Sequence, residues 1–177
     1  VDDDVIANLH IHDLLERHEI QEKPIEADEG SGKTTIYTIE NFEKKQIEDD
    51  MVGQFFSGDS YIIVYEYEMK RSKKCMIFYW LGSESTSDEK GSAALLTKEL
   101  DDKEFHGSAC QVRVVQGKEP ATLRSLFEGS MLIHTGGLAS GFKNRHDVSS
   151  KDEDGVALFH IHGTNHLDTY GVQVEEK

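Results

Sequence analysis

The stretch SYIIVYEYEMKRSKKCMIFYWLG, residues 60–82, decides the fold class. Its two arms, Ser60–Met69 and Cys75–Gly82, are rich in β-branched and aromatic residues, and the basic sequence KRSKK joins them. This pattern predicts two neighbouring strands. Both faces of the second arm are apolar, with Met76, Phe78 and Trp80 on one and Cys75, Ile77, Tyr79 and Leu81 on the other. Because such a strand must be covered on both sides, we expect a sheet with a layer packed on each face.

Further strands and two helices are predicted on either side of this stretch. The strand patterns lie at residues 35–42, 111–117, 130–137 and 155–163. The helical patterns cover Ser85–Asp102 and a shorter segment that begins at Pro120; their apolar spacing follows the helical period. We therefore predict an α+β domain in which a central mixed β-sheet lies between one long and one short helix.

The residues before this domain predict two separate segments. Residues 1–22 begin with an aspartate run after Val1 and carry apolar residues at partly helical spacing, which predicts an acidic helix. Residues 23–33 contain Pro24 and two glycines and predict a linker, so the compact domain covers residues 34–177. Since the chain begins with Val1 instead of Met, we expect it to be a piece of a longer protein.

Charge and composition narrow the function classes. The 177 residues carry a formal net charge of −15, with a sequence pI near 4.9, which argues against nucleic acid or an anionic membrane as the main partner. No apolar run is long enough to span a bilayer. Cys75 and Cys110 show neither a disulfide framework nor a zinc spacing, so we expect reduced, buried thiols in a cytosolic protein.

A short segment near the N-terminus resembles a phosphate-binding loop. Gly32, Lys33 and Thr34 match the end of a Walker A sequence, but an alanine stands where the first glycine belongs and carboxylates follow it. A phosphate loop also opens a helix, whereas the residues that follow Thr34 predict a strand. We interpret the segment as a linker that leads into a strand.

The predicted long helix directs one apolar side chain away from the core. On a helical wheel, the stripe that faces the sheet consists of Ala93, Leu96 and Leu100; this is the spacing of an amphipathic helix. Leu95 lies on the opposite side, next to Asp88 and Asp102. Such a leucine is either an ordinary exposed residue or an anchor for the hydrophobic cleft of a partner protein.

Glu89, at the start of this helix, supports two interpretations. Thr86 precedes it by three residues, so the pair can form a capping box. A carboxylate in a first helical turn can also bind a hard cation such as calcium, together with other carboxylate and carbonyl oxygens. The candidate oxygens are those of Asp59 and of the glycine-flanked segment TGGLASG, residues 135–141.

Four ordered motifs resemble successive parts of one repeat of the gelsolin, villin and severin family. They are GQFFSGDSYIIVYEY (residues 53–67), MIFYWLGSESTSDEKGSAALLTKELDD (76–102), VRVVQGKEPATLRSLFEG (112–129) and HTGGLASGF (134–142). The resemblance runs from about residue 36 to residue 174 and is greatest to the fourth repeat of six-repeat proteins. Residues 1–33 look like the connector between a third and a fourth repeat.

The resemblance implies a function without enzymatic activity. It implies a calcium-regulated actin-binding module of a multi-repeat protein that severs or caps filaments in the cytoplasmic actin cytoskeleton. The implied partners are actin, as monomer or filament end, and the neighbouring gelsolin-like repeats of the parent chain. Neither nucleic acid nor a membrane is an implied partner.

The resemblance also implies the residues of two calcium sites. An internal site would use the carbonyl of Gly58, the carboxylates of Asp59 and Glu89, and the carbonyl of Leu138. A second site, completed by a carboxylate of actin, would use the carboxylate of Asp101 with the carbonyls of Gly107 and Ala109. Relative to the family pattern, one extra residue lies between Asp102 and Gly107.

For actin, the resemblance implies contacts along the long helix, which wedges into a cleft between two actin subdomains. Leu95 falls at the position of the family's apolar anchor. The implied contact residues are Asp88, Ser92, Leu95, Glu99 and Asp102.

Two alternatives remain open from the sequence. His160, His162 and the nearby His166 have a spacing compatible with zinc, which would favour an enzyme. Alternatively, the repeat has lost actin binding and serves as a calcium-stabilised scaffold or interaction domain, with the N-terminal helix as its docking element.

Overall fold

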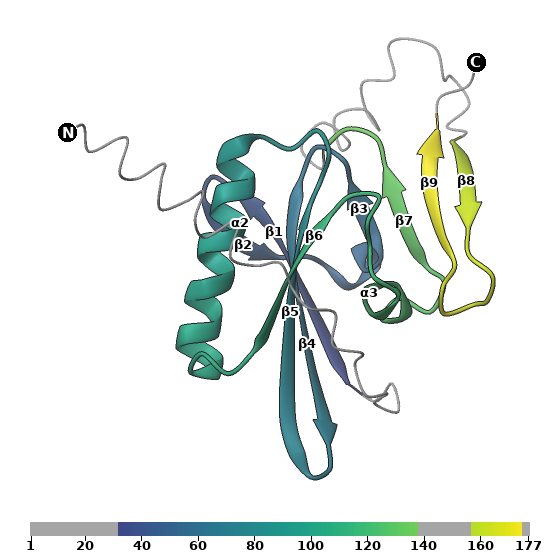
Figure 1. Ribbon diagram of the computed structural model, residues 1–177. Helices are drawn as coiled ribbons and strands as arrows, with labels where there is room; N and C mark the ends of the chain where they lie inside the picture. The colour runs from purple at the N-terminus through teal and green to yellow at the C-terminus, as the bar shows by residue number, and fades with distance from the viewer. Residues whose placement is uncertain (1–31, 138–156, 175–177) are drawn as a thin grey trace.

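The computed structural model describes residues 32–137 and 157–174, whose strands form two sheets (Figure 1). The predicted helix at residues 1–22 and nearly all of the 23–33 linker lie outside the described residues. The first sheet has the strand order β2-β1-β4-β5-β6, and the second has the order β3-β7-β9-β8. The strands are β1 (Lys33–Glu40), β2 (Glu43–Gln46), β3 (Gln54–Phe56), β4 (Ser60–Met69), β5 (Ser72–Leu81), β6 (Cys110–Val115), β7 (Met131–His134), β8 (Leu158–His162) and β9 (Tyr170–Val174). The helical elements are η1 (Asp49–Met51), α2 (Ser87–Leu100), η2 (Asp101–Phe105) and α3 (Ala121–Ser125).

A long hairpin of β4 and β5 forms the centre of the first sheet. The two strands pair antiparallel over their whole length, from Ser60 opposite Leu81 to Met69 opposite Ser72. Lys70 and Arg71 form the turn with φ angles of 51° and 64°, as a two-residue type I′ turn requires. β4 has its predicted bounds. β5 begins earlier than predicted, because so short a turn leaves the remaining basic residues to pair with β4.

The two faces of this sheet pack against different layers, as the alternation in β5 predicts. The buried cluster on one face includes Ile77, Tyr79 and Leu81 of β5 with Ala93 and Leu100 of α2. The cluster on the other face includes Met76, Phe78 and Trp80 of β5, Leu123 of α3, and Met131 and Ile133 of β7. The sheet therefore lies between a long and a short helix, and the predicted α+β fold is confirmed.

The sequence patterns did not separate the second sheet from the first. β3 pairs parallel with β7, and β7 pairs parallel with β9, each through three residue pairs. The predicted strand at residues 155–163 is observed as β8. The alternation of side chains along a strand indicates which of its faces is buried, but it does not indicate which distant strand becomes its neighbour.

Two further expectations concern the surface of the fold. Both thiols are free, but Cys75 is half-buried and Cys110 is exposed. The expectation of two buried thiols is wrong for Cys110, because this residue begins β6, an edge strand of the first sheet. Within the described residues, no helix is long and apolar enough to cross a membrane.

Candidate functional site

Hydrogen bonds hold two loops together next to the start of α2. The backbone N–H of Gly82 donates to the carbonyl of Asp59 at 3.0 Å, and that of Glu84 donates to the carbonyl of Ser57 at 2.8 Å. Gly82 allows this approach, since a Cβ atom there would lie 2.3 Å from the Ser57 carbonyl oxygen. The loop that carries Asp59 is therefore fixed against the segment that leads into α2.

A third segment reaches the same place from the end of β7. The backbone N–H of Gly58 donates to the carbonyl of Gly136 at 2.7 Å. A Cβ atom on Gly58 would lie 2.9 Å from the backbone nitrogen of Gly137. Leu138 lies outside the described residues, but the residue before it is in contact with Gly58. The structure thus brings the Gly58–Asp59 loop, the start of α2 and the approach to Leu138 to one end of the molecule.

The capping box that the sequence predicts at the start of α2 is present. Oε2 of Glu89 accepts hydrogen bonds from the backbone N–H of Thr86 at 2.8 Å and from the Thr86 hydroxyl at 3.0 Å. The Thr86 hydroxyl in turn accepts from the backbone N–H of Glu89 at 3.2 Å. Because these bonds to the carboxylate use Oε2, Oε1 remains available to a second ligand, and capping does not compete with a cation for the whole group.

Asp59 receives a hydrogen bond from within the core. The Tyr61 hydroxyl donates to Oδ2 of Asp59 at 3.1 Å. Burial, followed by the negative charge of Asp59, raises the pKa of Tyr61 far above its ordinary value, so the hydroxyl keeps its proton and remains a donor. This bond fixes the Asp59 side chain from the protein side.

The donors at this end of the molecule fit calcium chemistry. Calcium takes carboxylate and backbone carbonyl oxygens together, and the predicted set combines the carboxylates of Asp59 and Glu89 with carbonyls of the glycine-rich loops. Among residues 32–137 and 157–174, no three or more His, Cys, Asp or Glu side chains are placed so that they could hold a metal ion together, so backbone carbonyls would have to supply part of the coordination.

Sequence reasoning missed Glu84, a third carboxylate at this end. Oε2 of Glu84 accepts a hydrogen bond from the Ser57 hydroxyl at 3.1 Å, and the side chain is exposed. Its only signal in the sequence is its place between the predicted central strand and the long helix, two residues after Gly82.

The outer face of α2 presents the predicted apolar side chain. Leu95 is 56% exposed, whereas Ala93 and Leu100 are buried against the sheet. The predicted neighbours Asp88, Glu99 and Asp102 are exposed as well. Glu99 pairs with Lys103, and the carboxylate of Asp102 accepts from Lys98 at 2.5 Å, both at i,i+4 spacing. Leu95 is therefore an exposed apolar residue on a regular helix, with charged groups around it.

Ser92 differs from the other four residues predicted to contact actin. It is 7% exposed, and its hydroxyl donates to the carbonyl of Asp88 at 2.7 Å within the same helix. In this structure it offers almost no surface to a partner.

The structure also brings together the residues predicted for the second calcium site. Asp101 is 2% exposed; its Oδ1 accepts from the backbone N–H of Ala109 at 2.9 Å, and its Oδ2 accepts from the Gln111 side chain at 2.8 Å. The backbone N–H of Gly107 donates to the Asp101 carbonyl at 3.1 Å. These bonds hold the Asp101 carboxylate from the protein side, and its use of a second calcium ion stays a prediction.

The extra residue before Gly107 has a structural counterpart. After α2 the chain continues as the π-helical turn η2 (Asp101–Phe105), and His106 with φ of 55° ends it. A π-helical turn holds more residues than an α-helical one, so this turn is a place where one extra residue fits.

The histidines do not form a zinc site in the described residues. The rings of His160 and His162 lie 4.2 Å apart between centroids, and His162 stacks on Tyr170. His166 makes no three-residue metal cluster with them in the described part of the chain.

Comparison with known proteins shows to which family this domain belongs. Residues 41–124 match the family model named Gelsolin repeat. The chain is 45% identical over 130 residues to "Gelsolin, cytoplasmic" of Homarus americanus, and this match covers 73% of the chain and 17% of that protein. It is 42% identical over 149 residues to "Gelsolin" of Xenopus laevis, covering 84% of the chain and 34% of that protein. The fold and these matches define a gelsolin-like α+β domain; the chain carries a repeat of the gelsolin family.

The relatives are longer than this chain. The matches span 17% of the Homarus protein, 34% of the Xenopus protein and 14% of "Gelsolin" of Gallus gallus, to which the chain is 48% identical over 106 residues. Among solved structures, the chain is similar to one in the crystal structure of the Thorarchaeota 2DGel3/rabbit actin complex, with a TM-score of 0.45 and 24% identity over 81% of this chain and 64% of that chain.

Proposed function

We propose that this chain is a calcium-regulated actin-binding module of a multi-repeat protein that severs or caps filaments in the cytoplasmic actin cytoskeleton. It acts as a binding module and not as an enzyme. Its membership of the gelsolin family, with three gelsolins among its relatives, supports this assignment.

The observation that carries the proposal is Leu95. It is 56% exposed at the middle of a helix whose opposite side is fixed to the sheet by Ala93 and Leu100. Burying a leucine side chain contributes about 1.5–3 kcal/mol, which is roughly a ten- to a hundredfold gain in affinity. A rigid helix loses little freedom on binding, so Leu95 suits an anchor for a hydrophobic cleft on actin.

Calcium regulation would act through the orientation of this helix. In our proposal, Asp59 and Glu89 supply carboxylates, and Gly58 and Leu138 supply carbonyls, to one ion. A bound calcium ion would supply a cross-link between the Asp59 loop and the first turn of α2. Without the ion, two carboxylates directed at one site would repel each other. The helix would then have two orientations, one with the ion and one without. Calcium shifts the equilibrium between them only by the difference in its affinity for the two.

The test is replacement of Leu95 by aspartate. We expect Leu95→Asp to lower the affinity for monomeric actin at least tenfold in a pyrene-actin assay, because a charge then enters the apolar cleft. Leu158→Asp is the matched control, since Leu158 is 51% exposed on β8, away from α2. Equal losses in both variants, or none in Leu95→Asp, would refute the role of Leu95. A folded wild-type chain that binds calcium but not actin would favour the scaffold alternative.

A further inference from the structure

A pocket of about 290 Å³ lies on the α3 face of the first sheet, between strands β1 and β2 and the segment that contains η1. Thr38 on β1 pairs with Tyr61 on β4, and Tyr61 belongs to the core cluster on the α3 face. Helix α2, which carries Leu95, packs on the opposite face. An occupant of this pocket would therefore lie on the other side of the sheet from a partner at Leu95.

The inner part of the pocket contains a hydroxyl group without a protein partner. Thr38 lines the pocket and is 3% exposed, and its side chain makes no hydrogen bond within the described residues. The unpaired side-chain oxygens that are sealed from solvent in this part of the chain belong to Thr97 and Glu119, so the Thr38 hydroxyl remains accessible from the pocket. Because an unpaired buried hydroxyl costs free energy, a hydrogen-bonding group that enters the pocket removes this cost.

The sides of the pocket are largely apolar and are held in place by backbone bonds. Ile47, Met51 and Tyr61 line it, and Ile47 packs against the core cluster. The backbone N–H of Ile47 donates to the carbonyl of Ile36 at 3.1 Å, and that of Met51 donates to the carbonyl of Glu48 at 3.0 Å. Because these bonds fix the segment, the pocket is already formed for an occupant.

Acidic side chains lie at the mouth of the pocket. Glu40, Glu48 and Asp50 line it and are exposed. Among the described residues that line it, Lys45 is basic, and its ammonium lies 3.7 Å from the carboxylate of Glu40. Glu48 and Asp50 form no ion pair within the described part of the chain. Two carboxylates at the mouth are therefore available to a cation.

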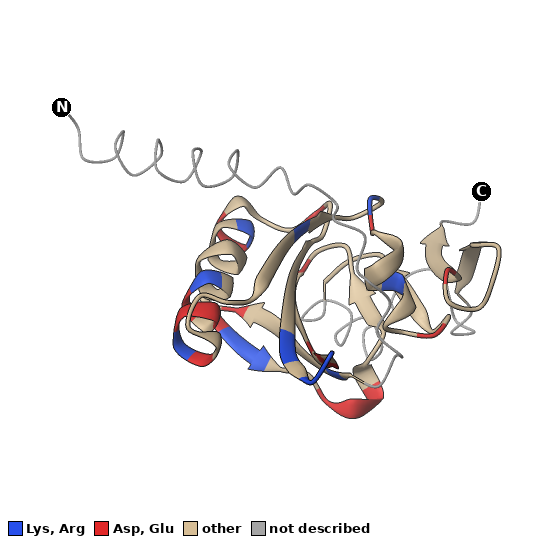
Figure 2. Cartoon of the chain, turned by 60° about the horizontal axis from the view of Figure 1, so that its bottom comes forward, with Lys and Arg blue, Asp and Glu red and all other residues tan. Residues whose placement is uncertain are grey.

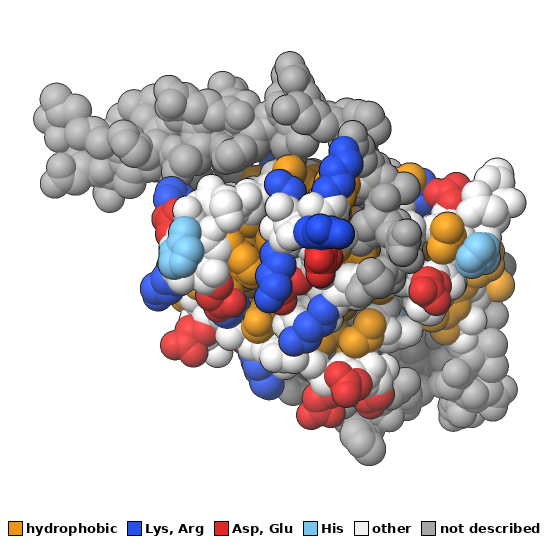
Figure 3. Space-filling view, turned by 90° about the horizontal axis from the view of Figure 1, so that it is seen from below, with side chains coloured by type: hydrophobic (Ala, Val, Ile, Leu, Met, Phe, Trp, Pro, Cys, Tyr) orange, Lys and Arg blue, Asp and Glu red, His pale blue; other side chains and the backbone are white. Residues whose placement is uncertain are grey.

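The basic residues of the β4–β5 hairpin lie too far away to neutralise this mouth. Residues 70–74 contain four basic residues; Figure 2 shows them at the end of the hairpin, and in Figure 3 basic side chains gather near the middle of the face seen from below. Tyr61 is near the opposite end of β4, and a strand rises about 3.3 Å per residue, so the turn is roughly 30 Å from the pocket. The Debye length is about 8 Å at physiological ionic strength.

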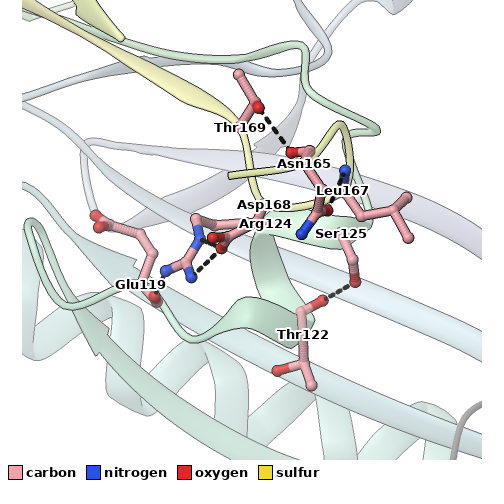
Figure 4. A network of polar contacts seen from close by, with 8 residues as sticks. All are labelled: Glu119, Thr122, Arg124, Ser125, Asn165, Leu167, Asp168 and Thr169. Carbon is pink, nitrogen blue, oxygen red and sulfur yellow. Dashed lines mark hydrogen bonds and ion pairs between the residues drawn. The ribbon is translucent and has the colours of Figure 1, made fainter. Parts of the chain in front are cut away.

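A larger groove, of about 650 Å³, lies beside α3 and differs in its polar groups. Several of them bond with one another (Figure 4). Nε of Arg124 donates to Oδ1 of Asp168 at 2.8 Å, and the hydroxyl of Ser125 donates to the carbonyl of Thr122 at 3.0 Å. Because these groups already have partners within the protein, they do not indicate a ligand, whereas Thr38 does.

We propose that this pocket binds an arginine side chain of a partner protein. The apolar stem of the arginine contacts Ile47 and Met51, and the guanidinium bonds to the Thr38 hydroxyl and to the carboxylates of Glu48 and Asp50. A guanidinium has five N–H donors on three nitrogens, so it reaches the inner hydroxyl and the mouth together, which a single ammonium nitrogen does not.

The size and the charge of the pocket favour a side chain over a small molecule. Its volume of about 290 Å³ lies at the lower end of the range of about 300–1,000 Å³ for small-molecule sites. A free arginine also carries an α-carboxylate, which the acidic mouth would repel. Since the pocket and Leu95 lie on opposite faces of the sheet, this proposal does not depend on the proposed function.

NMR titration of the isotope-labelled whole chain with a capped peptide, acetyl-Gly-Arg-Gly-amide, tests this proposal. We expect saturable chemical-shift changes at the amides of Thr38 and Met51. The same peptide with citrulline in place of arginine should bind at least tenfold more weakly, because citrulline has almost the same shape but no charge. Both titrations use the wild-type chain, so they do not depend on the folding of a variant.

Two pairs of variants then test the two parts of the pocket. E48Q/D50N should lower the affinity for the arginine peptide at least fivefold, whereas E66Q/E68Q removes two exposed carboxylates of β4 outside the pocket and should not. Thr38→Val removes the inner hydroxyl and should lower the affinity at least threefold. Its control is Thr35→Val, on the same strand but outside the pocket.

Three outcomes would overturn the proposal. One is equal binding of the arginine and citrulline peptides by the wild-type chain. The second is equal affinity for the arginine peptide within either pair of variants. The third is tighter binding of free L-arginine than of the capped peptide, because the pocket would then be a site for a small molecule and not for a partner protein.

Discussion

At the scale of single residues, the structure shows one of the two roles that the sequence context leaves as alternatives for Glu89, the capping box, and our proposal adds the other. Its Oε2 atom completes the capping box with Thr86, and its charge would serve the cation. The two tasks are separable, because glutamine also completes a capping box but carries no charge.

We therefore predict that Glu89→Gln keeps the fold and weakens calcium binding at least tenfold in isothermal titration calorimetry. Glu99→Gln is the matched control, since it removes a carboxylate from the exposed surface near the other end of α2. Unchanged calcium affinity in Glu89→Gln would remove this residue from the site.

The two thiols provide a second prediction. Burial and then the negative charges of Glu66 and Asp101 raise the pKa of Cys75 to about 12, so at pH 8 it is almost entirely protonated. The thiolate is the nucleophile, and Cys110 is exposed. Iodoacetamide should alkylate Cys110 at least tenfold faster than Cys75, with one adduct accumulating in intact-mass spectra and Cys110→Ser reacting slowly. Simultaneous appearance of both adducts would contradict this.

Some of these residues could be predicted from the sequence and others could not. Leu95 follows from the helical period alone, because the helix is regular and its core stripe is clear. The inward position of Ser92 does not, since the wheel angle of a small polar residue says little about its burial. The burial of Asp101 does not follow from the sequence either. Its carboxylate is stabilised by hydrogen bonds from the backbone N–H of Ala109 and the side-chain amide of Gln111.

At the scale of elements, close backbone approach at Gly82 joins the Asp59 loop to the start of α2. We predict that Gly82→Ala destabilises the domain by about 1–3 kcal/mol or more in urea denaturation, because its Cβ atom would lie 2.3 Å from the Ser57 carbonyl oxygen and 2.5 Å from that of Asp59. Both contacts are with backbone, which cannot rotate away.

The control for this prediction is Gly91→Ala on α2. Apart from its chain neighbours and the backbone of its own helix, no atom of the described residues lies within 4 Å of a Cβ atom placed at Gly91, and alanine in a helix interior is more favourable than glycine by about 0.5–1 kcal/mol. Gly91→Ala should therefore stabilise the domain. A neutral effect of Gly82→Ala would show that the two loops are not packed as tightly as described.

Prediction from sequence succeeds for elements with a strong local pattern. Ser60–Met69 is recovered with its bounds as β4, and the long helix is recovered apart from its ends. The π-helical turn after Leu100 could not be predicted, because its residues show no hydrophobic period. The short strand β3, Gln54–Phe56, is strand because of its parallel pairing with β7, which is distant in sequence.

At the scale of the whole molecule, the first sheet packs against a different layer on each of its faces. The first sheet carries α2 and its exposed Leu95 on one face. On the other face, α3 and the second sheet close the core, and the loop after β7 reaches the Gly58–Asp59 loop. The loops around Gly58 and Asp59 and the helix that presents Leu95 are therefore parts of one packed unit, which is what the proposed coupling between ion and partner requires.

The most direct test of this coupling is to measure the affinity of the whole chain for actin, once in calcium and once in excess chelator. With monomeric actin and a fluorescence readout, we predict binding at least tenfold tighter in calcium than in chelator, and loss of that difference in Glu89→Gln. Equal affinity for actin in calcium and in chelator, or absence of binding in both with the domain folded, would contradict the account.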